Sequence, residues 1–460
     1  MSEHAADVVV VGLGPGGEDV AGRLAEAGLE VVAVNAGLVG GECPYWGCIP
    51  SKMMVRGAGL LAEARRVPDL AGSVDGVTGD WSKVATRIRD EATDDWDDQV
   101  AVDRLTGKGV TFVRGRGRLV STDTVEVDGE RYTARKGVVV ATGSAPSIPP
   151  IDGIDTVDVW TNHEFIEAKE PARVARRAGR RGDRRRASAR CRRGTACRSR
   201  SSSGPSGCSR WRSRRRPSLV LKAFEADGVT VRTGVGATGV RPGDDGGVVV
   251  TLDDGSEVAA ERLLVASGRR VDVAAVGLDV VGVDPHAHAV PVDEWCRVEG
   301  AEQVWALGDV VGHGAFTHMS MFEADVVVRD LLGQGGEPAT WHAIPRVTFT
   351  DPEVGAVGLT EAQAREQYPN VRVGSTPLES TTRGWIHGPG GAGVIHVVED
   401  ADRGVLVGAT SVGPCGGEVL GFLALAVHAR IPVSTMLAMP YAYPTFHRGI
   451  ETALKALRDQ

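Results

Sequence analysis

No run of apolar residues in this chain reaches the roughly 18 positions that a membrane-spanning helix requires. The opening residues, 1–7, are polar and lead directly into an apolar stretch, so they lack the pattern of a secretory leader. Cysteine is scarce, with seven among 460 residues. These absences favour a cytoplasmic protein without a membrane partner, and in that reducing compartment a disulfide is more often catalytic than structural.

Two of the cysteines, Cys43 and Cys48, lie five positions apart in the stretch 40–52. A short turn can bring both sulfurs together, and Cys48 lies at the start of an expected helix, 51–66, whose positive end stabilises a thiolate. An incidental pair or half of a metal site are the alternatives. No second Cys/His pair at zinc spacing lies nearby, so we expect a redox pair beside an electron-carrying cofactor and no metal site.

A glycine fingerprint precedes the cysteines. It begins after the apolar run 8–11, read as a buried strand, and is followed by a helical pattern and a second apolar run, 31–34. Its glycines are Gly12, Gly14 and Gly17. They suit a tight turn, backbone approach to a pyrophosphate, and close helix–strand packing. In this βαβ setting the fingerprint indicates dinucleotide binding, and Asn35 occupies the position that usually carries a ribose-binding acid.

The middle of the chain carries an internal repeat. After helices with an acidic surface, where 94–98 is expected to be a solvated face, a hairpin begins at Val125 and its second strand leads to Thr142 and Gly143. A similar hairpin over 248–265 leads to Gly268 and Arg269. The echo predicts two related dinucleotide-binding domains, the second inserted into the first.

The second domain lacks the expected opening strand, glycine fingerprint and helix. Residues 173–216 hold 18 arginines and one acidic residue, whereas the rest of the chain holds 34 basic and 59 acidic residues. A nucleic-acid arm and a natural disordered insertion are possible readings. We favour a shift of reading frame, because out-of-frame GC-rich codons yield Arg, Gly, Ala, Ser, Pro and Cys. No nucleic-acid partner is therefore expected, and the three cysteines of the block receive no function.

Beyond the repeat, a short apolar strand ends in Gly308 and Asp309, which places a carboxylate where it can bind cofactor hydroxyls. Thr317 then opens a helix whose N-terminal amides can face an electron-rich ring. A further unit of strands and helices begins at 344–359. Its apolar helix, 418–430, suits either a subunit interface or ordinary core packing.

Taken together, these motifs resemble the FAD-dependent pyridine nucleotide-disulfide oxidoreductases, the family of dihydrolipoamide dehydrogenase, glutathione and mycothione reductases and mercuric reductase. The resemblance implies an α/β protein with an FAD-binding Rossmann-like domain, an inserted NAD(P)-binding domain and a C-terminal α+β dimerisation domain. The expected ranges are 1–150 and 271–340 for FAD, 151–270 for NAD(P), with 173–218 disrupted and disordered, and 341–460 for dimerisation. FAD, NAD(P)H as co-substrate and a homodimer follow from the same resemblance.

Site roles are carried over motif by motif. Cys43 would be the interchange thiol and Cys48 the flavin-side thiol, while Asp309 would bind the ribityl chain. Lys52 would lie near the flavin ring. The other residues expected to contact cofactors are Thr142, Gly143, Arg269 and Gly308, together with the fingerprint glycines and Asn35.

Two departures bear on activity. Where family disulfide reductases place a catalytic histidine and its orienting glutamate, this chain has Tyr443 and Arg448. A tyrosine is a poor base at neutral pH, and His447 is either an alternative base or a histidine at the edge of the core. The Arg-rich block removes the second fingerprint. We therefore expect either an NAD(P)H-dependent disulfide or metal-ion reductase, whose partner is a small disulfide, low-molecular-weight thiol or metal ion, or an FAD-binding protein without turnover.

Overall fold

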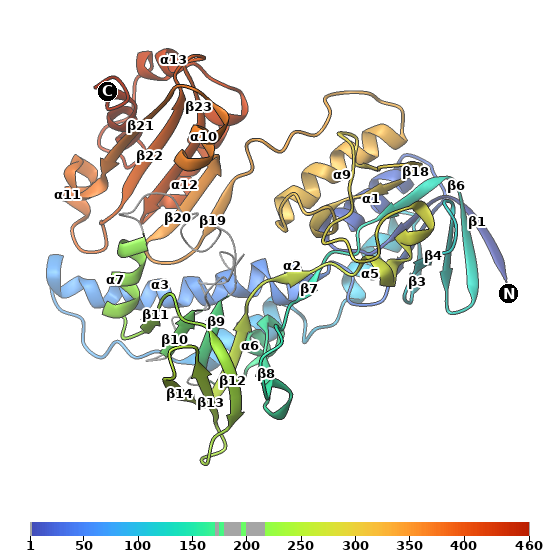
Figure 1. The fold of residues 1–460 in the computed structure, drawn as a ribbon, viewed down its shortest axis with the longest axis horizontal. Helices are drawn as coiled ribbons and strands as arrows, with labels where there is room; N and C mark the ends of the chain where they lie inside the picture. The colour runs from blue at the N-terminus through green and yellow to red at the C-terminus, as the bar shows by residue number, and fades with distance from the viewer. Residues whose placement is uncertain (1, 171–173, 179–194, 199–216, 460) are drawn as a thin grey trace. The chain divides into compact units, whose positions relative to one another are not determined.

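The computed structural model describes residues 2–170, 174–178, 195–198 and 217–459 (Figure 1). The chain divides into two units. The first comprises Met1–Pro50, Thr86–Ser147 and Arg269–Trp341, and the second comprises Ser51–Ala85, Ile148–Gly268 and His342–Gln460. The first unit thus joins segments from both predicted parts of the FAD-binding domain. Among the described residues, no helix combines the length and the apolar composition needed to cross a membrane.

A mostly parallel sheet forms the centre of the first unit. Its strand order is β17 (Arg297–Val298), β18 (Ala301–Ala306), β6 (Glu130–Val140), β1 (Glu3–Val11), β2 (Val31–Asn35) and β3 (Thr111–Arg114). All neighbours run parallel except β17 and β18. Val9 and Val11 enter one hydrophobic core, whereas Val8 and Val10 enter a second core. Because both faces of β1 are buried, the strand has a continuous apolar run and no alternation.

The βαβ unit that the sequence predicts is present. Helix α1 (Pro15–Glu26) joins β1 to β2, and it packs against α9 (Thr317–Leu331) from the other end of the unit. The remaining α-helices of this unit are α2 (Glu42–Trp46), α5 (Gln99–Gly107) and α8 (Val273–Val276). Helix α9 begins at Thr317, as expected from the sequence.

The hairpin predicted from Val125 is confirmed. Strand β5 (Thr124–Val127) pairs antiparallel with β6, and β4 (Arg118–Leu119) pairs with β5. At the turn, Asp128 has φ 49° and Gly129 has φ 84°. Two successive left-handed residues match the twist of the paired strands, which is why the Asp-Gly dipeptide signals this turn.

The second unit contains a parallel and an antiparallel sheet in its middle segment. The parallel order is β11 (Thr230–Arg232), β10 (Thr195–Arg198), β9 (Val174–Ala178), β15 (Arg262–Ala266) and β8 (Val159–Trp160). The antiparallel order is β12 (Ala237–Pro242), β13 (Val248–Leu252) and β14 (Glu257–Ala260). Helices α4 (Trp81–Arg87), α6 (Asn162–Glu167) and α7 (Pro217–Ala226) accompany them. The β13–β14 hairpin and the following strand β15 are the predicted repeat of the β5–β6 hairpin and the apolar end of β6.

The Arg-rich block differs from expectation at two short segments. Strands β9 and β10 lie inside it, where the sequence predicts no strand. Backbone pairing explains the difference, because β9 pairs in parallel with β15, whose own run is apolar and buried. Most of the block lies outside the described residues. Its expected disorder and the reading-frame hypothesis therefore remain predictions.

An antiparallel sheet carries the C-terminal part of the second unit. Its order is β19 (Arg346–Thr348), β20 (Glu353–Gly358), β23 (Val405–Gly413), β22 (Val394–Asp400) and β21 (Val371–Pro377). Helices α10 (Glu361–Gln367), α11 (Thr382–His387), α12 (Gly416–His428), α13 (Val433–Ala438) and α14 (Gly449–Lys455) follow the strands or connect them. Leu420 and Leu423 of α12 are buried against this sheet, so one face of the apolar helix packs in the core. Leu425, 58% exposed, lies on its open face.

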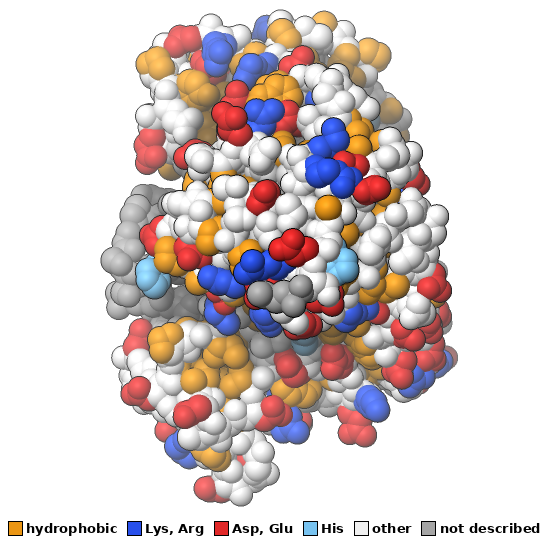
Figure 2. Space-filling view, turned by 90° about the vertical axis from the view of Figure 1, so that its right-hand side faces the viewer, with side chains coloured by type: hydrophobic (Ala, Val, Ile, Leu, Met, Phe, Trp, Pro, Cys, Tyr) orange, Lys and Arg blue, Asp and Glu red, His pale blue; other side chains and the backbone are white. Residues whose placement is uncertain are grey.

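The surface carries charges of both signs. Figure 2 shows acidic and basic side chains interspersed on the face that it draws. On that face the described residues form no continuous basic strip of the kind that follows a nucleic-acid backbone.

Candidate active site

The glycine fingerprint forms the turn between β1 and α1. Gly12 has φ 95°, and Gly14 precedes the first residue of α1 without any side chain capping the helix. A Cβ at Gly17 would lie 2.0 Å from the Gly12 carbonyl oxygen, so only glycine permits this packing. The first amides of α1 therefore remain available to an anion, and the cradle fits the pyrophosphate of a dinucleotide.

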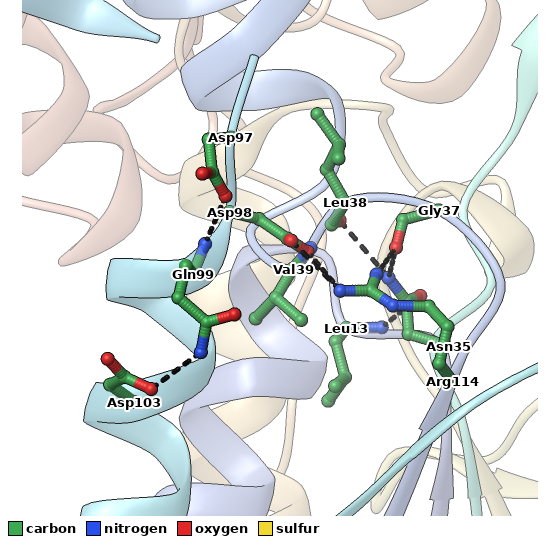
Figure 3. A network of polar contacts seen from close by, with 10 residues as sticks. All are labelled: Leu13, Asn35, Gly37, Leu38, Val39, Asp97, Asp98, Gln99, Asp103 and Arg114. Carbon is green, nitrogen blue, oxygen red and sulfur yellow. Dashed lines mark hydrogen bonds and ion pairs between the residues drawn. The ribbon is translucent and has the colours of Figure 1, made fainter. Parts of the chain in front are cut away.

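Asn35, at the end of β2, holds this turn in place (Figure 3). Its Oδ1 accepts a hydrogen bond from the Leu13 amide at 3.0 Å. Its Nδ2 donates to the Gly37 carbonyl at 2.8 Å and to the Leu38 carbonyl at 3.1 Å. Both amide hydrogens are thus used on the backbone. The predicted contact of Asn35 with a ribose remains a prediction, and it can use only the remaining capacity of Oδ1.

Asp98 corrects the expectation of a solvated acidic face at 94–98. Only 8% of Asp98 is exposed, and its Oδ2 accepts from the Val39 amide at 2.6 Å. Arg114 adds a two-pronged contact, with Nη2 at 2.9 and 2.7 Å from the two carboxylate oxygens (Figure 3). The carboxylate is buried because a guanidinium and a backbone amide replace its water. The neighbouring Asp94, Asp95 and Asp97 are exposed, as predicted.

The structure brings the two site cysteines together. Cys43 lies in α2, and Cys48 is the first residue of α3 (Cys48–Leu70). Gly47 separates the helices, and a Cβ there would lie 2.7 Å from the Glu42 carbonyl oxygen, so the turn requires glycine. Both cysteines are free thiols, and their side chains are hydrogen-bonded to each other. The sulfur of Cys48 also lies 3.3 Å from the Thr317 hydroxyl.

The two thiols are not equivalent. The hydrogen bond with Cys48 raises the pKa of the Cys43 thiol above its ordinary value, and burial raises it further. The roles carried over from the family, with Cys43 as the interchange thiol and Cys48 as the flavin-side thiol, remain predictions.

Arg269 links three motifs that are far apart in sequence. Its Nε donates to the Ser144 hydroxyl at 2.6 Å, and its Nη1 donates to Glu42 at 3.1 Å. The same Nε lies 3.5 Å from Asp309 Oδ2, which also accepts from the Ser144 hydroxyl. Asp309 Oδ1 makes no hydrogen bond with the described residues, so it is available for a cofactor hydroxyl. Ser144 and Glu42 are not among the site residues predicted from the sequence, although each is adjacent to one of them, Gly143 and Cys43.

The loop after β6 lies directly against the fingerprint. A Cβ at Gly12 would lie 2.6 Å from the Ala141 backbone and 2.7 Å from the Thr142 Cα atom. Gly143, the next residue, has φ 69°. Thr142 and Gly143 thus border the same cradle as Gly12, as expected for residues that contact one cofactor.

A buried carboxylate anchors the Gly308–Asp309 turn. Glu323, with no exposed surface, accepts from the Gly308 amide at 2.7 Å and from the Trp341 indole at 3.1 Å. The sequence analysis also missed Glu323. Its only signal is a carboxylate among the apolar residues of α9.

Lys52, Tyr443 and His447 belong to the second unit, whereas the cysteines belong to the first. Lys52 Nζ lies 4.4 Å from the centre of the Phe349 ring. The His447 Nδ1 is 2.9 Å from the Thr445 hydroxyl, and its ring packs near Tyr441. This setting suits the histidine at the core edge that the sequence left as one alternative. The expected roles of Lys52 and His447 at the thiols remain predictions.

Tyr443 is 66% exposed and donates to the Thr382 hydroxyl at 3.3 Å. The guanidinium of Arg448 lies 5.4 Å from its ring centre. A cation therefore accompanies the tyrosine where the family has a carboxylate beside a histidine. Within the described part of the chain, no group of three or more His, Cys, Asp or Glu side chains is placed to hold a metal ion.

Two family models match nearly the whole chain. The model described as pyridine nucleotide-disulphide oxidoreductase matches residues 6–178 and 214–326, and the model of the dimerisation domain of the same description matches residues 344–454. The first match omits 179–213, which lies within the Arg-rich block.

The chain is similar along its length to enzymes of known kind. A dihydrolipoyl dehydrogenase from Thermus scotoductus is 33% identical, and the alignment covers 99% of this chain and 98% of that protein. A mercuric reductase from Streptomyces lividans is 28% identical, with coverage of 97% and 95%.

Solved structures confirm the predicted α/β fold class. LpdA from Mycobacterium tuberculosis matches with a TM-score of 0.82 at 22% identity, covering 99% of both chains. The HOCl-induced flavoprotein disulfide reductase RclA from Escherichia coli also matches with a TM-score of 0.82 at 22% identity, covering 98% of this chain and 99% of its own.

Proposed function

Because this chain belongs to the pyridine nucleotide-disulphide oxidoreductase family, whose members bind FAD and use NAD(P)H, we propose that Cys43 and Cys48 carry its electrons. Electrons that bound FAD can accept from NAD(P)H would pass to the thiol pair, and from there to a small disulfide, such as the oxidised form of a low-molecular-weight thiol, or to a metal ion. The observation that carries the proposal is the contact of the two sulfurs within the unit that holds the glycine cradle.

The residues of the first unit fit FAD. The amides at the start of α1 would bind its pyrophosphate, because no side chain caps them. Asp309 Oδ1 would accept from a ribityl hydroxyl, while Ser144 and Arg269 hold the other carboxylate oxygen. When bound, FAD supplies the ability to accept a hydride and pass on two electrons.

The thiol chemistry is a pair of exchange reactions. Cys43 loses its proton and attacks the substrate disulfide, so a mixed disulfide forms and the first substrate thiolate leaves. Cys48 then attacks the sulfur of Cys43, which forms the Cys43–Cys48 disulfide and releases the second thiolate. The first leaving thiolate takes up the proton that Cys43 gave up, and the second takes up the proton of Cys48. Two electrons have moved from the cysteines to the substrate, and the Cys43–Cys48 disulfide would have to be reduced again before the next turnover.

Cys43 needs a proton acceptor, because its pKa is raised. In the family this acceptor comes from the C-terminal domain of a second subunit, and the match of the dimerisation domain to residues 344–454 supports a homodimer. Tyr443 would then meet the partner's thiols. We propose that it donates a hydrogen bond to the leaving thiolate, since a phenol is a poor base at neutral pH.

Flavin content and two cysteine variants test this function. The purified chain should be yellow, with about one FAD per chain. Cys43→Ser and Cys48→Ser should each abolish disulfide reduction by the frame-restored protein, and only Cys48→Ser should also remove the long-wavelength thiolate–flavin absorbance. A folded preparation that takes up no flavin, or a Cys48→Ser variant that keeps this band, would contradict the assignment.

A second function is an FAD-binding protein without turnover. It is favoured by the gap in the family match at 179–213, where a phosphate cradle for NAD(P)H is expected. Holding the nicotinamide against the flavin can contribute about 7–11 kcal/mol to lowering the barrier. Anaerobic stopped-flow reduction at saturating NADH and NADPH would compare this chain with a frame-corrected version. Equal rates would show that the Arg-rich block is competent and would exclude this second function.

A further inference from the structure

A cavity of about 190 Å³ lies within the C-terminal part of the second unit. It is enclosed by the segments 376–383 and 443–452. The lining residues that matter here are Thr376, Thr382, Arg383, Tyr443, Arg448 and Thr452. Hydroxyl and guanidinium groups thus face the cavity, and none of its lining residues is an Asp or a Glu.

Arg383 provides an uncompensated positive charge. Its guanidinium lies 5.4 Å from the centre of the Phe446 ring, and it forms no ion pair with the described residues. This contact with an aromatic ring uses none of the guanidinium N–H groups as conventional hydrogen-bond donors, so they can still donate to an oxygen acceptor. The charge of this half-buried guanidinium is neither fully hydrated nor paired with a carboxylate, and this costs free energy that a bound anion would recover.

Arg448, at the other end of the cavity, is already compensated. Its Nη2 lies 3.3 Å from the Oε2 of Glu451, and its Nη1 donates to the Tyr441 carbonyl at 3.1 Å. The excess positive charge of the cavity therefore centres on Arg383. Arg448 adds to the field but has less capacity for a new partner.

Thr376 adds an unsatisfied hydroxyl. Only 2% of Thr376 is exposed, and its Oγ1 is buried without a hydrogen-bond partner among the described residues. A buried hydroxyl without a partner costs free energy that a hydrogen-bonding ligand would recover.

We propose that this cavity binds a small oxyanion, namely the carboxylate or phosphate group of a ligand. The planar guanidinium of Arg383 matches two oxygens of such a group, and the surrounding hydroxyls supply further donors. No lining carboxylate repels it. This binding requires neither FAD nor the Arg-rich block, so it does not depend on the proposed electron path.

Titration calorimetry on the full chain tests the site. Sodium phosphate and sodium acetate are titrated separately, and sodium chloride is adjusted so that the ionic strength is the same in the cell and in the syringe. The variants are Arg383→Gln and Thr376→Val, with Arg365→Gln as the matched control. Arg365 is an exposed arginine in the same unit, paired with Glu361 across one turn of α10.

We expect one site per chain, and the anion that binds more tightly identifies its source as phosphate or carboxylate. Arg383→Gln should weaken binding at least about tenfold, since a hydrogen bond to a charged group is lost. Thr376→Val should weaken it several-fold without lowering the unfolding temperature, because the free protein loses only an unsatisfied hydroxyl. Arg365→Gln should bind like the parent chain.

The proposal is overturned if neither anion binds, or if Arg383→Gln binds as tightly as Arg365→Gln does. Should Arg383→Gln fail to fold, Arg383→Lys keeps the charge and loses the planar fork. It should then bind more weakly than the parent chain, and equal binding would overturn the proposal.

Discussion

The sulfur of Cys48 lies 3.3 Å from the hydroxyl of Thr317, so the first residue of α3 contacts the first residue of α9. Two helix starts, each with amides free of intrahelical partners, thus meet at one sulfur. The contact joins the cysteine segment to the Gly308–Asp309 side of the cofactor cradle, although 269 positions separate the two residues in sequence.

Thr317→Val should weaken the thiolate–flavin absorbance of the reduced protein. The substitution keeps the shape of the side chain but removes a donor to the Cys48 sulfur, and a hydrogen bond to a charged group contributes about 1.5–3 kcal/mol. The band at pH 7 should fall by up to about tenfold, as measured by anaerobic titration with dithionite. Thr317→Ser, which keeps the hydroxyl, is the control, and a full-strength band in Thr317→Val would mean that the contact has no electronic role.

The alkylation of Cys43 should depend on pH in a way that Cys48 controls. The raised pKa of Cys43 means that its thiol stays protonated at pH values where an ordinary cysteine ionises, so iodoacetamide should modify it only at higher pH. Cys48→Ala removes the main cause of the rise. The alkylation midpoint of Cys43, measured by peptide mass spectrometry, should therefore move to lower pH.

Cys415 serves as the internal control for that experiment. Desolvation and the nearby Glu353 raise its pKa, and neither cause involves Cys48. Its midpoint should be the same in both proteins. An unchanged Cys43 midpoint in Cys48→Ala would show that the thiols do not interact as described.

Asn35→Asp should lower the affinity for FAD. If Asn35 served only as a ribose acceptor, a carboxylate would bind the hydroxyl better. In the structure, however, its Nδ2 donates to the Gly37 and Leu38 carbonyls, and an aspartate would place negative charge against both oxygens. We expect the dissociation constant for FAD to rise at least about tenfold, because two hydrogen bonds of about 1 kcal/mol each are lost. Equal or tighter binding, followed by flavin fluorescence, would favour the ribose role.

Glu323→Ala should destabilise the first unit. It leaves the Gly308 amide and the Trp341 indole without an acceptor in a buried site. Each unsatisfied donor costs about 1–3 kcal/mol, so for two donors we expect a loss of about 2–6 kcal/mol in the free energy of unfolding. Urea unfolding followed by tryptophan fluorescence measures it, and the exposed Glu302→Ala is the control. If Glu323→Ala and Glu302→Ala had the same midpoint of urea unfolding, Glu323 would not stabilise the Gly308–Asp309 turn.

Local rules determined the parts of the fold that the sequence alone could predict. Gly12 is required because its φ is positive, and Gly17 is required because a Cβ there would lie 2.0 Å from the Gly12 carbonyl oxygen. The turn at Asp128 and Gly129 needs residues that tolerate left-handed backbone angles. The sequence predicts the helix after the cysteines over 51–66, and α3 extends this range to Cys48–Leu70. Such features depend on a few neighbouring residues, so their patterns can be read along the chain.

Tertiary structure alone decided the rest. The sequence places Asp98 in an acidic run, but Val39 and Arg114 bury it. Strand β9 forms without an apolar pattern because β15 supplies its backbone partner. The bonds from Arg269 to Ser144 and Glu42 span 125 and 227 positions. No local pattern encodes such partners, because a buried polar group is stabilised by whichever donor or acceptor the folded chain brings to it.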